Sequence, residues 1–350
     1  MKIKNNDILS LDKYINEALY NGKTGYYMNK NPFGIKGDFI TAPNVSILFS
    51  EMIAIWIISF WQNIKCPKKI NLIELGSGNG EMINQLVKTF ENFPLFKNSY
   101  KIYILEKSPH LKKIQKKKLK NKNITWLNNI NKISNHPNIF IANEFFDALP
   151  IKQFIKKNNK WYERNVRFTK SSKPELLDIL CDMNQIEKKV GFKISNKQKF
   201  IEYSPLAVKY LKLIAEKINL NNGGILIIDY GYWDNSMKNT IKSISNHKHV
   251  DFLDNFGQAD ITYNINFRII EKILKNFNLK ISGKSNQRNF LINLGILKRA
   301  EIISKNLPFS KKADIYYRIK RLIDKNSMGE LFKVMLATNK NVNFKTGFVN

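Results

Sequence analysis

The chain has 350 residues, of which 43% are hydrophobic and 25% charged, which excludes a disordered or collagen-like protein. Two cysteines and four histidines without metal-ligand spacing exclude a disulfide framework, and we expect no metal site. The net charge is +30, but only seven of the 58 basic residues are Arg. We attribute most of this excess to a Lys-, Asn- and Ile-rich composition rather than to nucleic-acid binding.

No apolar run approaches the roughly 20 residues that a membrane span needs, and the N-terminus carries acidic residues instead of an apolar signal segment. The sequence therefore predicts a soluble, cytoplasmic protein of the bacterial type, without a membrane partner.

Strands and helices are expected to alternate in the first half of the chain. Residues 70–75 (INLIEL) form a short, mainly apolar run that is followed by glycines, which is typical of a buried parallel strand. The predicted elements, in chain order, are an amphipathic helix at 1–20, a glycine-punctuated loop at 25–43, a helix at 46–63, strands at 70–75, 101–105, 124–127 and 138–142, a helix at 81–90, and a very basic helix after residue 106.

The second half continues the alternation after an insertion. Residues 152–168 alternate around the turn 157–160 and predict a β-hairpin. Further predicted elements are helices at 205–219, 267–277 and 313–325 and a strand at 224–228. This pattern indicates an α/β fold with a mostly parallel, doubly wound sheet. The predicted parts are an N-terminal extension over the site (1–69), the first half of the core (70–150), an inserted substrate subdomain (151–203), and the rest of the core with a helical C-terminal region (204–350).

The strongest motif is the turn GSGNG, which follows the strand 70–75 and precedes a helix. Glycines allow a tight turn and close approach of the backbone to a ligand. An acidic residue before the turn and another, Glu106, at the end of the next strand favour the methyl donor S-adenosyl-L-methionine (SAM) over NAD, which remains the alternative. The candidate donor-binding residues are Glu74, Gly76, Ser77, Gly78, Gly80, Glu106, Asn128 and Asn129.

The second motif, NEFFDALP, ends the predicted strand 138–142. Asn143, Glu144 and Asp147 are our candidate catalytic residues, because two carboxylates at the ligand-binding edge of a sheet can pair with a cationic guanidinium. The alternative is that Asn143 and Asp147 cap a helix while the two phenylalanines pack in the core.

Several blocks occur in a fixed order: GYY…NPFGIKGDFITAP, ELGSGNG, NEFFDALP, EYSP, IDYG and MGELFKVM. This set resembles the MidA-type methyltransferase family, which includes the mitochondrial complex I assembly-factor arginine methyltransferases. The resemblance implies a class I SAM-dependent, Rossmann-like fold and symmetric dimethylation of a protein arginine, with a respiratory complex I type subunit as one conceivable target. It also places Gly37, Asp38, Phe39 and Thr41 near donor or substrate, although a structural turn is an equal alternative. Asn264 and Asn266 stand where we expect the family to favour His and Asp.

Two other functions stay open on the sequence alone. An RNA methyltransferase would explain the positive charge if lysines cluster around the pocket mouth. An assembly factor with a vestigial donor site would bind a protein partner without transferring methyl groups. The basic run at 112–122 is interpreted as a solvated helix face, with a docking surface as the alternative, and a homodimer is possible.

Overall fold

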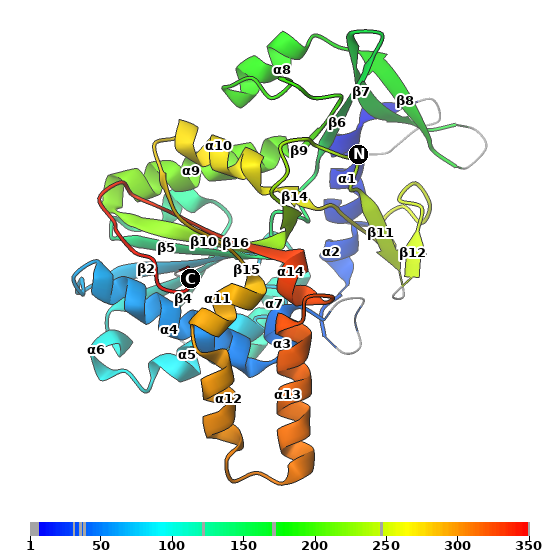
Figure 1. Ribbon diagram of the computed structural model, residues 1–350. Helices are drawn as coiled ribbons and strands as arrows, with labels where there is room; N and C mark the ends of the chain where they lie inside the picture. The colour runs from blue at the N-terminus through cyan, green and yellow to red at the C-terminus, as the bar shows by residue number, and fades with distance from the viewer. Residues whose placement is uncertain are drawn as a thin grey trace.

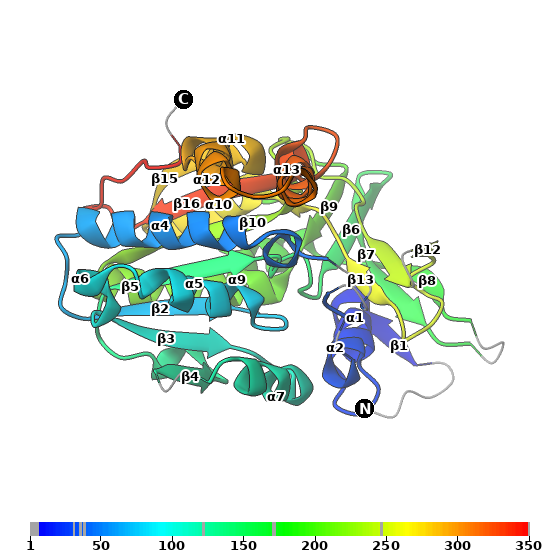
Figure 2. The same cartoon turned by 90° about the horizontal axis from the view of Figure 1, so that it is seen from below.

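A computed structural model gives the fold of residues 7–30, 32–34, 37, 40–120, 123–169, 173–245 and 248–348. A central sheet lies between two layers of helices, and smaller sheets extend from one end (Figures 1 and 2). Within the described part of the chain, no helix is long and apolar enough to cross a membrane.

The main sheet has the strand order β4-β3-β2-β5-β10-β16-β15. Its strands are β2 (Ile70–Leu75), β3 (Tyr100–Leu105), β4 (Ile124–Leu127), β5 (Asn138–Asn143), β10 (Gly223–Tyr232), β15 (Lys280–Asn286) and β16 (Phe332–Thr338), with the short β14 (Ile265–Asn266) beside β10. The first five are parallel, and β16 runs antiparallel to β10 and β15. The predicted doubly wound, mostly parallel sheet is confirmed. The chain leaves β2 in one direction to β3 and returns on the other side as β5, so the carboxyl ends of β2 and β5 form the switch point where such sheets bind ligands.

Helices cover both faces of this sheet. They are α4 (Ile47–Asn63), α5 (Glu81–Phe90), α6 (Pro94–Lys97), α7 (Pro109–Lys118), the short η1 (Ile130–Lys132), α9 (Pro205–Asn221), α10 (Phe267–Asn276), α11 (Gln287–Asn293), α12 (Ile296–Ser304), α13 (Phe309–Ile323) and α14 (Met328–Leu331). Leu72 packs with α4 and α5 on one face, whereas Ile73 packs with α9 and α10 on the other. Because helices cover both faces, all six residues of β2 are buried, including the polar Asn71 and Glu74.

The insertion after β5 forms a separate antiparallel sheet, with the order β1-β7-β6-β9 and β8 beside β7. Its elements are β6 (Lys152–Lys157), β7 (Lys160–Arg167), β8 (Glu175–Leu180), β9 (Phe200–Tyr203) and the helix α8 (Met183–Val190). The predicted hairpin is confirmed, and its turn residues Asn158 and Asn159 have φ of +46° and +58°. Two consecutive left-handed residues match the right-handed twist of the flanking strands.

The N-terminal segment corrects one prediction. The elements here are β1 (Ile8–Ser10), α1 (Leu11–Tyr20), α2 (Tyr26–Asn29) and α3 (Ala42–Val45). Residues 8–10 are not helical, because they pair with β7 of the insertion, Ile8 opposite Arg167. This pairing joins the chain's beginning to the inserted sheet and brings α1 over the carboxyl edge of the main sheet.

A third sheet completes the region around that edge. It consists of β11 (Lys242–Ser245), β12 (Lys248–Val250) and β13 (Asp260–Thr262), in the order β12-β11-β13. In Figure 2 this sheet lies at the same end of the molecule as α1 and the inserted sheet. Segments far apart in sequence therefore meet at the end where the parallel strands terminate.

Candidate functional site

The chain turns sharply between β2 and α5 through three glycines. Gly76, Gly78 and Gly80 have φ of 68°, 51° and 77°, a region that glycine adopts without steric cost. A Cβ on Gly76 would lie 2.9 Å from Cδ2 of Phe145, which lines the large cavity described below, whereas a Cβ on Gly80 would press on Leu119. The backbone at Gly76 and Gly78 borders the cavity, and Gly80 closes the turn.

A buried carboxyl group lies beside this turn. Glu74 accepts a hydrogen bond from Oγ of Ser77. Burial raises the pKa of Glu74 to about 7; the bond from Ser77 opposes this rise and the Glu106 charge adds to it. Glu74, Gly76, Ser77 and Thr41 line a small cavity of 40 Å³, which agrees with their prediction as donor-binding residues.

Glu106 follows β3 and is held in one orientation by its neighbours. Its Oε1 accepts a hydrogen bond from the backbone N–H of Ser108 at 2.9 Å, and its Oε2 accepts one from Nε2 of Gln115 at 3.0 Å. The same Nε2 lies 2.9 Å from the carbonyl oxygen of Gly78, so Gln115 links the carboxylate to the glycine turn. This geometry suits a carboxylate that accepts hydrogen bonds from ribose hydroxyls. Nothing in the local sequence pattern singled out Gln115.

The two predicted asparagines after β4 have different positions. Asn128 lines the large cavity, and its Oδ1 lies 2.5 Å from Nζ of Lys112. Asn129 is not among the residues that line either cavity at this edge; its Oδ1 accepts the backbone N–H of Asn131 at 2.9 Å and caps the short helix η1. The structure thus supports Asn128 as a donor contact and gives Asn129 a capping role instead.

The predicted loop before α3 is only partly at the site. Thr41 lines both cavities, but Gly37 lines neither, and its N–H donates to the carbonyl oxygen of Gly34 at 2.9 Å. For Gly37 the structural-turn alternative therefore fits the geometry. Asp38 and Phe39 lie outside the described residues.

The end of β5 carries the three predicted catalytic residues: Asn143 lines the small cavity, Asp147 lines the large one, and Glu144 lines both. Glu144 has a φ of +50°, unusual for a residue with a side chain, and its Oε1 accepts hydrogen bonds from the N–H of Ala42 at 3.3 Å and from Nδ2 of Asn143 at 3.2 Å. Asp147 is buried, and its Oδ2 accepts a bond from Oγ1 of Thr262 at 3.2 Å. No helix begins at residues 143–150, all of which are described, so the capping alternative is wrong.

Both carboxyl groups have raised pKa values. Burial raises the pKa of Glu144 to about 8, and the charge of Asp147 adds to the rise. Burial raises the pKa of Asp147 to about 6, against the hydrogen bond from Thr262 and the positive charge of Lys242. Two acidic groups that are difficult to ionise together provide a site where an incoming cation is favoured.

A residue that the sequence did not single out holds this turn in place. Asp229, near the end of β10, is completely buried, and its Oδ2 accepts the backbone N–H groups of Phe145, Phe146 and Asp147 at 3.2, 3.0 and 3.4 Å. Its Oδ1 accepts the N–H of Tyr230 at 2.9 Å. Burial raises the pKa of Asp229, and the backbone donors oppose that rise. The IDYG motif indicated a strand end, but its contact with the NEFFD turn depends on the pairing of β10 with β5.

A cavity of 730 Å³ connects these groups, a size usual for a small-molecule site. The glycine turn and Glu106 lie on its sheet side, while α1, α2 and the third sheet cover it. Aromatic side chains form much of its wall; they are Tyr20, Tyr27, Phe33, Phe145, Tyr210 and Tyr230. Tyr20 stacks on Tyr27 with ring centroids 5.6 Å apart, and its hydroxyl donates to the carbonyl oxygen of Ala148 at 2.9 Å. Residues of α1 and α2 therefore form part of the cavity wall.

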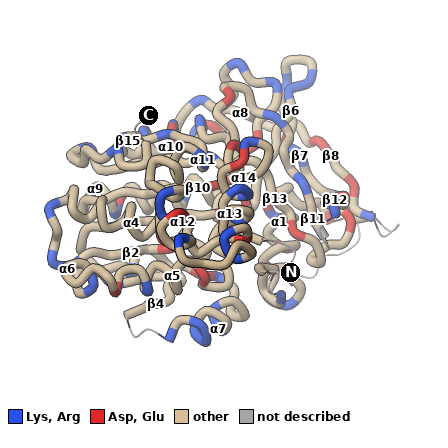
Figure 3. The backbone as a smooth tube through the Cα atoms, turned by 60° about the horizontal axis from the view of Figure 1, so that its bottom comes forward, with Lys and Arg blue, Asp and Glu red and all other residues tan. Residues whose placement is uncertain are grey.

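The charges around the cavity suit a cation better than a polyanion. Four acidic residues line it (Glu106, Glu144, Asp147 and Asp260), against Lys107 and Lys242. Nζ of Lys242 lies 5.2 Å from the ring centroid of Tyr230 and 3.2 Å from Oδ1 of Asn264. On the face in Figure 3, Lys and Arg are spread over many elements. The lysine cluster at the pocket mouth that an RNA substrate requires is not found among the described lining residues.

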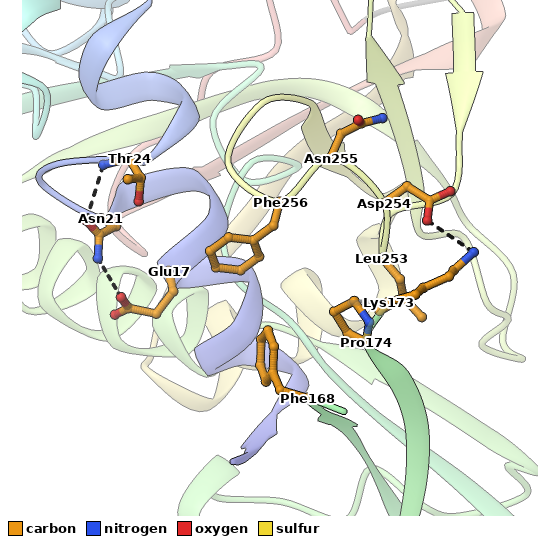
Figure 4. A pocket seen from close by; sticks show the side chains of 10 residues that line it. All are labelled: Glu17, Asn21, Thr24, Phe168, Lys173, Pro174, Leu253, Asp254, Asn255 and Phe256. Atoms are coloured by element: carbon orange, nitrogen blue, oxygen red, sulfur yellow. Dashed lines mark hydrogen bonds and ion pairs between the residues drawn. The ribbon is translucent and has the colours of Figure 1, made fainter. Parts of the chain in front are cut away.

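A second hollow lies nearby, on another side of α1 (Figure 4). This open groove of 790 Å³ is lined by Glu17, Asn21, Thr24, Phe168, Lys173, Pro174, Leu253, Asp254, Asn255 and Phe256. Figure 4 shows Lys173 paired with Asp254 and Asn21 bonded to Glu17. Because none of its lining residues comes from the glycine turn or from the end of β5, we assign the functional site to the 730 Å³ cavity.

The residues at this site fit a SAM molecule. The backbone at Gly76 and Gly78 allows a ligand to come close to the main chain, and Glu106 provides a hydrogen-bond acceptor in the same cavity. Oδ1 of Asn143 is buried without a hydrogen-bond partner in the structure, at the small cavity that Glu74 also lines. The hydrogen-bond acceptor of Asn143 and the carboxyl group of Glu74 suit the ammonium group of the methionine part of SAM.

Comparisons with known proteins agree with this site. Residues 52–285 match the model of the family Methyltransf_28, which is described as a family of S-adenosyl-L-methionine-dependent methyltransferases. The mitochondrial protein arginine methyltransferase NDUFAF7 of Xenopus tropicalis is 29% identical, with 95% of this chain and 83% of that protein aligned; its human counterpart is 26% identical, with 95% and 80% aligned.

A crystal structure of a Burkholderia thailandensis protein bound to S-adenosyl-homocysteine has the same fold, with a TM-score of 0.80 and 21% identity over 98% of this chain and 89% of that one. These findings confirm the resemblance drawn from the ordered motifs, together with the class I methyltransferase fold and the SAM cofactor. The chain belongs to the Methyltransf_28 family of S-adenosyl-L-methionine-dependent methyltransferases.

Proposed function

We propose that this methyltransferase modifies an arginine side chain of a protein partner. Relatives that align with 95% of the chain are named protein arginine methyltransferases. Symmetric dimethylation, and a subunit of a complex I type respiratory enzyme as the target, are the finer parts of the proposal and follow from the MidA-type resemblance. The observation that carries the proposal is that Glu144 and Asp147 line the same cavity as the glycine turn and Glu106.

The donor side of the cavity binds SAM and orients its methyl group. SAM supplies an electrophilic methyl group on a sulfonium sulfur. Glu106 accepts hydrogen bonds from the ribose, and the backbone of Gly76 and Gly78 allows close contact. Asn143 and Glu74 hold the amino-acid part. Fixing the donor in this way reduces the entropy cost of bringing the methyl group into line with its acceptor.

The other side of the cavity binds the acceptor. An arginine has a pKa above 12 and a delocalised charge, so its nitrogen is a weak nucleophile until it is oriented and can lose a proton. Glu144 and Asp147 accept N–H hydrogen bonds from the guanidinium and turn one nitrogen toward the methyl group. As the N–C bond forms and the S–C bond breaks, a carboxylate takes the proton that the nitrogen releases. The aromatic wall keeps water from the reacting atoms.

Label transfer tests this function. Protein lysate from cells that lack the gene is incubated with the purified enzyme and SAM labelled in the methyl group, and labelled peptides are sequenced by mass spectrometry. We expect methylated arginine in a small set of proteins, with the dimethyl product in the symmetric form. Label on RNA, or on other side chains only, would contradict the proposal. SAM binding by calorimetry without any transfer would favour an assembly factor instead.

A further inference from the structure

Two antiparallel helices project from the body of the protein. In Figure 1, α12 and α13 extend beyond the helical layer that covers the sheet, and the turn between them forms the far end. We call residues 305–312, which include this turn and the start of α13, the hairpin tip. Neither cavity at the catalytic site includes a residue of the tip.

The base of the hairpin is firmly attached. Nε of Arg299 on α12 lies 2.8 Å from a carboxylate oxygen of Glu51 on α4, and Nη1 of Arg318 on α13 lies 3.2 Å from the carbonyl oxygen of Val45. Ile319 and Leu322 are buried in the main core. The projection is therefore an integral part of the fold, and its tip is held at a fixed distance from the body.

The tip is apolar and exposed. Leu307, Pro308 and Phe309 are consecutive, and the exposed fractions of Leu307 and Phe309 are 38% and 85%. Tyr317, two turns further along α13, is 71% exposed. A phenylalanine that is 85% exposed at the start of α13 gains little from packing within this chain, which indicates contact with another molecule.

The tip is also basic. Lys305, Lys311 and Lys312 flank the apolar residues, and none of the three forms an ion pair in the described structure. From residue 296 to 323 the hairpin has eight Lys and Arg against two acidic residues. Figure 3 shows basic positions along both α12 and α13. This excess of positive charge favours a negatively charged partner.

The shape of the tip distinguishes between negatively charged partners. A second copy of this hairpin would bring like charges together, which opposes self-association. None of the cavities and grooves described above is lined by a residue of the tip. An aromatic residue surrounded by lysines, presented on a rigid support, is instead suited to enter the headgroup region of a bilayer while the lysines meet lipid phosphates.

We propose that the hairpin tip docks this methyltransferase on an anionic membrane surface. Phe309 and Leu307 enter the lipid headgroup region, and the three lysines contact anionic headgroups. The sequence-based expectation of no membrane partner rested on the lack of a spanning segment, and docking on a surface does not require one. This inference is independent of the acceptor that the enzyme methylates.

Vesicle co-sedimentation tests the proposal with the full chain. We expect binding to vesicles that contain phosphatidylglycerol, weak binding to pure phosphatidylcholine vesicles, and loss of binding at high salt because exposed charges are then screened. Phe309→Ser should weaken binding on the order of tenfold, from the lost apolar contact. Reversing Lys305, Lys311 and Lys312 together to Glu should weaken it more than tenfold.

Matched controls exist elsewhere on the surface. Leu95 on α6 is 85% exposed, as Phe309 is, so Leu95→Ser removes an equally exposed apolar side chain. Lys65, Lys68 and Lys69 are exposed between α4 and β2, and their reversal to Glu changes the net charge by the same amount. Both controls should retain vesicle binding, and all variants should keep the melting temperature and SAM affinity of the parent protein.

Four results would overturn the proposal. They are vesicle binding that survives the tip substitutions, equal losses in the matched controls, a soluble dimer that the tip substitutions dissociate, and equally tight binding to polyglutamate that does not depend on Phe309. The last two would identify a second copy or an acidic macromolecule as the partner.

Discussion

The donor side and the acceptor side of the cavity are built in different ways. Most of the donor side comes from one continuous stretch, in which β2, the glycine turn, α5 and β3 follow one another in the sequence, whereas Thr41, Asn128 and Asn143 join it from other segments. The acceptor side is assembled from the end of β5, the N-terminal helices, β10 and the third sheet, and its lining residues Asn16 and Thr262 lie 246 positions apart in the sequence. The first can be recognised in a short motif, and the second depends on how distant segments meet.

Because the two sides are built from different segments, substitutions can affect SAM binding and methyl transfer separately. Substitutions on the donor side should change the affinity for SAM, and substitutions on the acceptor side should change the rate of transfer while SAM affinity stays the same. The predictions below test that separation, beginning with the largest expected effect.

The double substitution Glu144→Gln and Asp147→Asn should have the largest effect on transfer. It removes both groups that orient the guanidinium and accept its proton, so we expect kcat/KM for an arginine substrate to fall by about 10²- to 10⁴-fold. Calorimetry should show SAM affinity within about twofold of the parent protein. Full transfer activity in the double variant would remove these residues from the mechanism.

Gly76→Ala tests the donor side. The positive φ and the 2.9 Å approach of the new Cβ to Phe145 both oppose an alanine. Strain of about 1–3 kcal/mol at such a position corresponds to roughly 10- to 100-fold weaker SAM binding if the turn shifts to relieve it. Gly22→Ala is the control, because a Cβ there meets no atom within 4 Å. An unchanged affinity of Gly76→Ala for SAM would show that the glycine turn does not form part of the SAM-binding site.

Asp229→Asn tests the positioning of the acceptor side. An amide has one accepting oxygen, so either the three N–H groups at Oδ2 or the one at Oδ1 lose their acceptor. We expect kcat to fall about tenfold and the free energy of unfolding to fall by about 2 kcal/mol in urea titrations. SAM affinity should not change. The exposed Asp234→Asn serves as the control, and a kcat equal to that of the parent would contradict the positioning role.

The pH dependence of kcat/KM reports on the acceptor carboxylates. The reaction needs an ionised carboxylate to take the proton, and burial raises the pKa of Glu144 to about 8 and that of Asp147 to about 6. Activity should therefore rise between pH 6 and 8 and level off above. Because these acids bind protons more tightly in the folded state, stability should decrease as the pH rises from about 4, near the ordinary carboxyl pKa, to about 8. Glu144→Gln should abolish the upper inflection, and a flat profile would contradict the assignment.

Lys242→Met should have the smallest effect. The lysine lies in the acceptor cavity and lowers the pKa of Asp147, so it competes electrostatically with an incoming guanidinium. Removing the charge should lower KM for an arginine peptide by a few fold with little change in kcat. Lys238→Met, at an exposed ion pair with Asp234, is the matched control. A higher KM in Lys242→Met would show that the lysine assists binding.

The position of the glycine turn and its acidic neighbours could be predicted from the sequence because local rules govern it. An apolar strand that runs into glycines allows few conformations, so Glu74, Gly76 and Glu106 could be placed from their neighbours alone. Asn129 was misjudged because an asparagine after a strand suits a ligand contact and a helix cap equally well, and only the structure distinguishes the two.

The acceptor side was harder to predict because its contacts join distant segments. Glu144 and Asp147 were found since they directly follow a strand of the parallel sheet. Asp229 and Lys242 reach them from 82 or more residues away in the sequence, through strand pairings that no local pattern reveals. The start of α1 was misplaced for the same reason, since residues 8–10 adopt a strand only in the presence of β7.

A crystal structure of this protein soaked with S-adenosyl-homocysteine would test the central claim most directly. The account predicts the ribose hydroxyls at Glu106, the amino-acid part near Asn143 and Glu74, and the sulfur facing Glu144 across the cavity. Density for the ligand in the groove lined by Phe168 and Phe256, or a glycine turn that excludes it, would contradict the account.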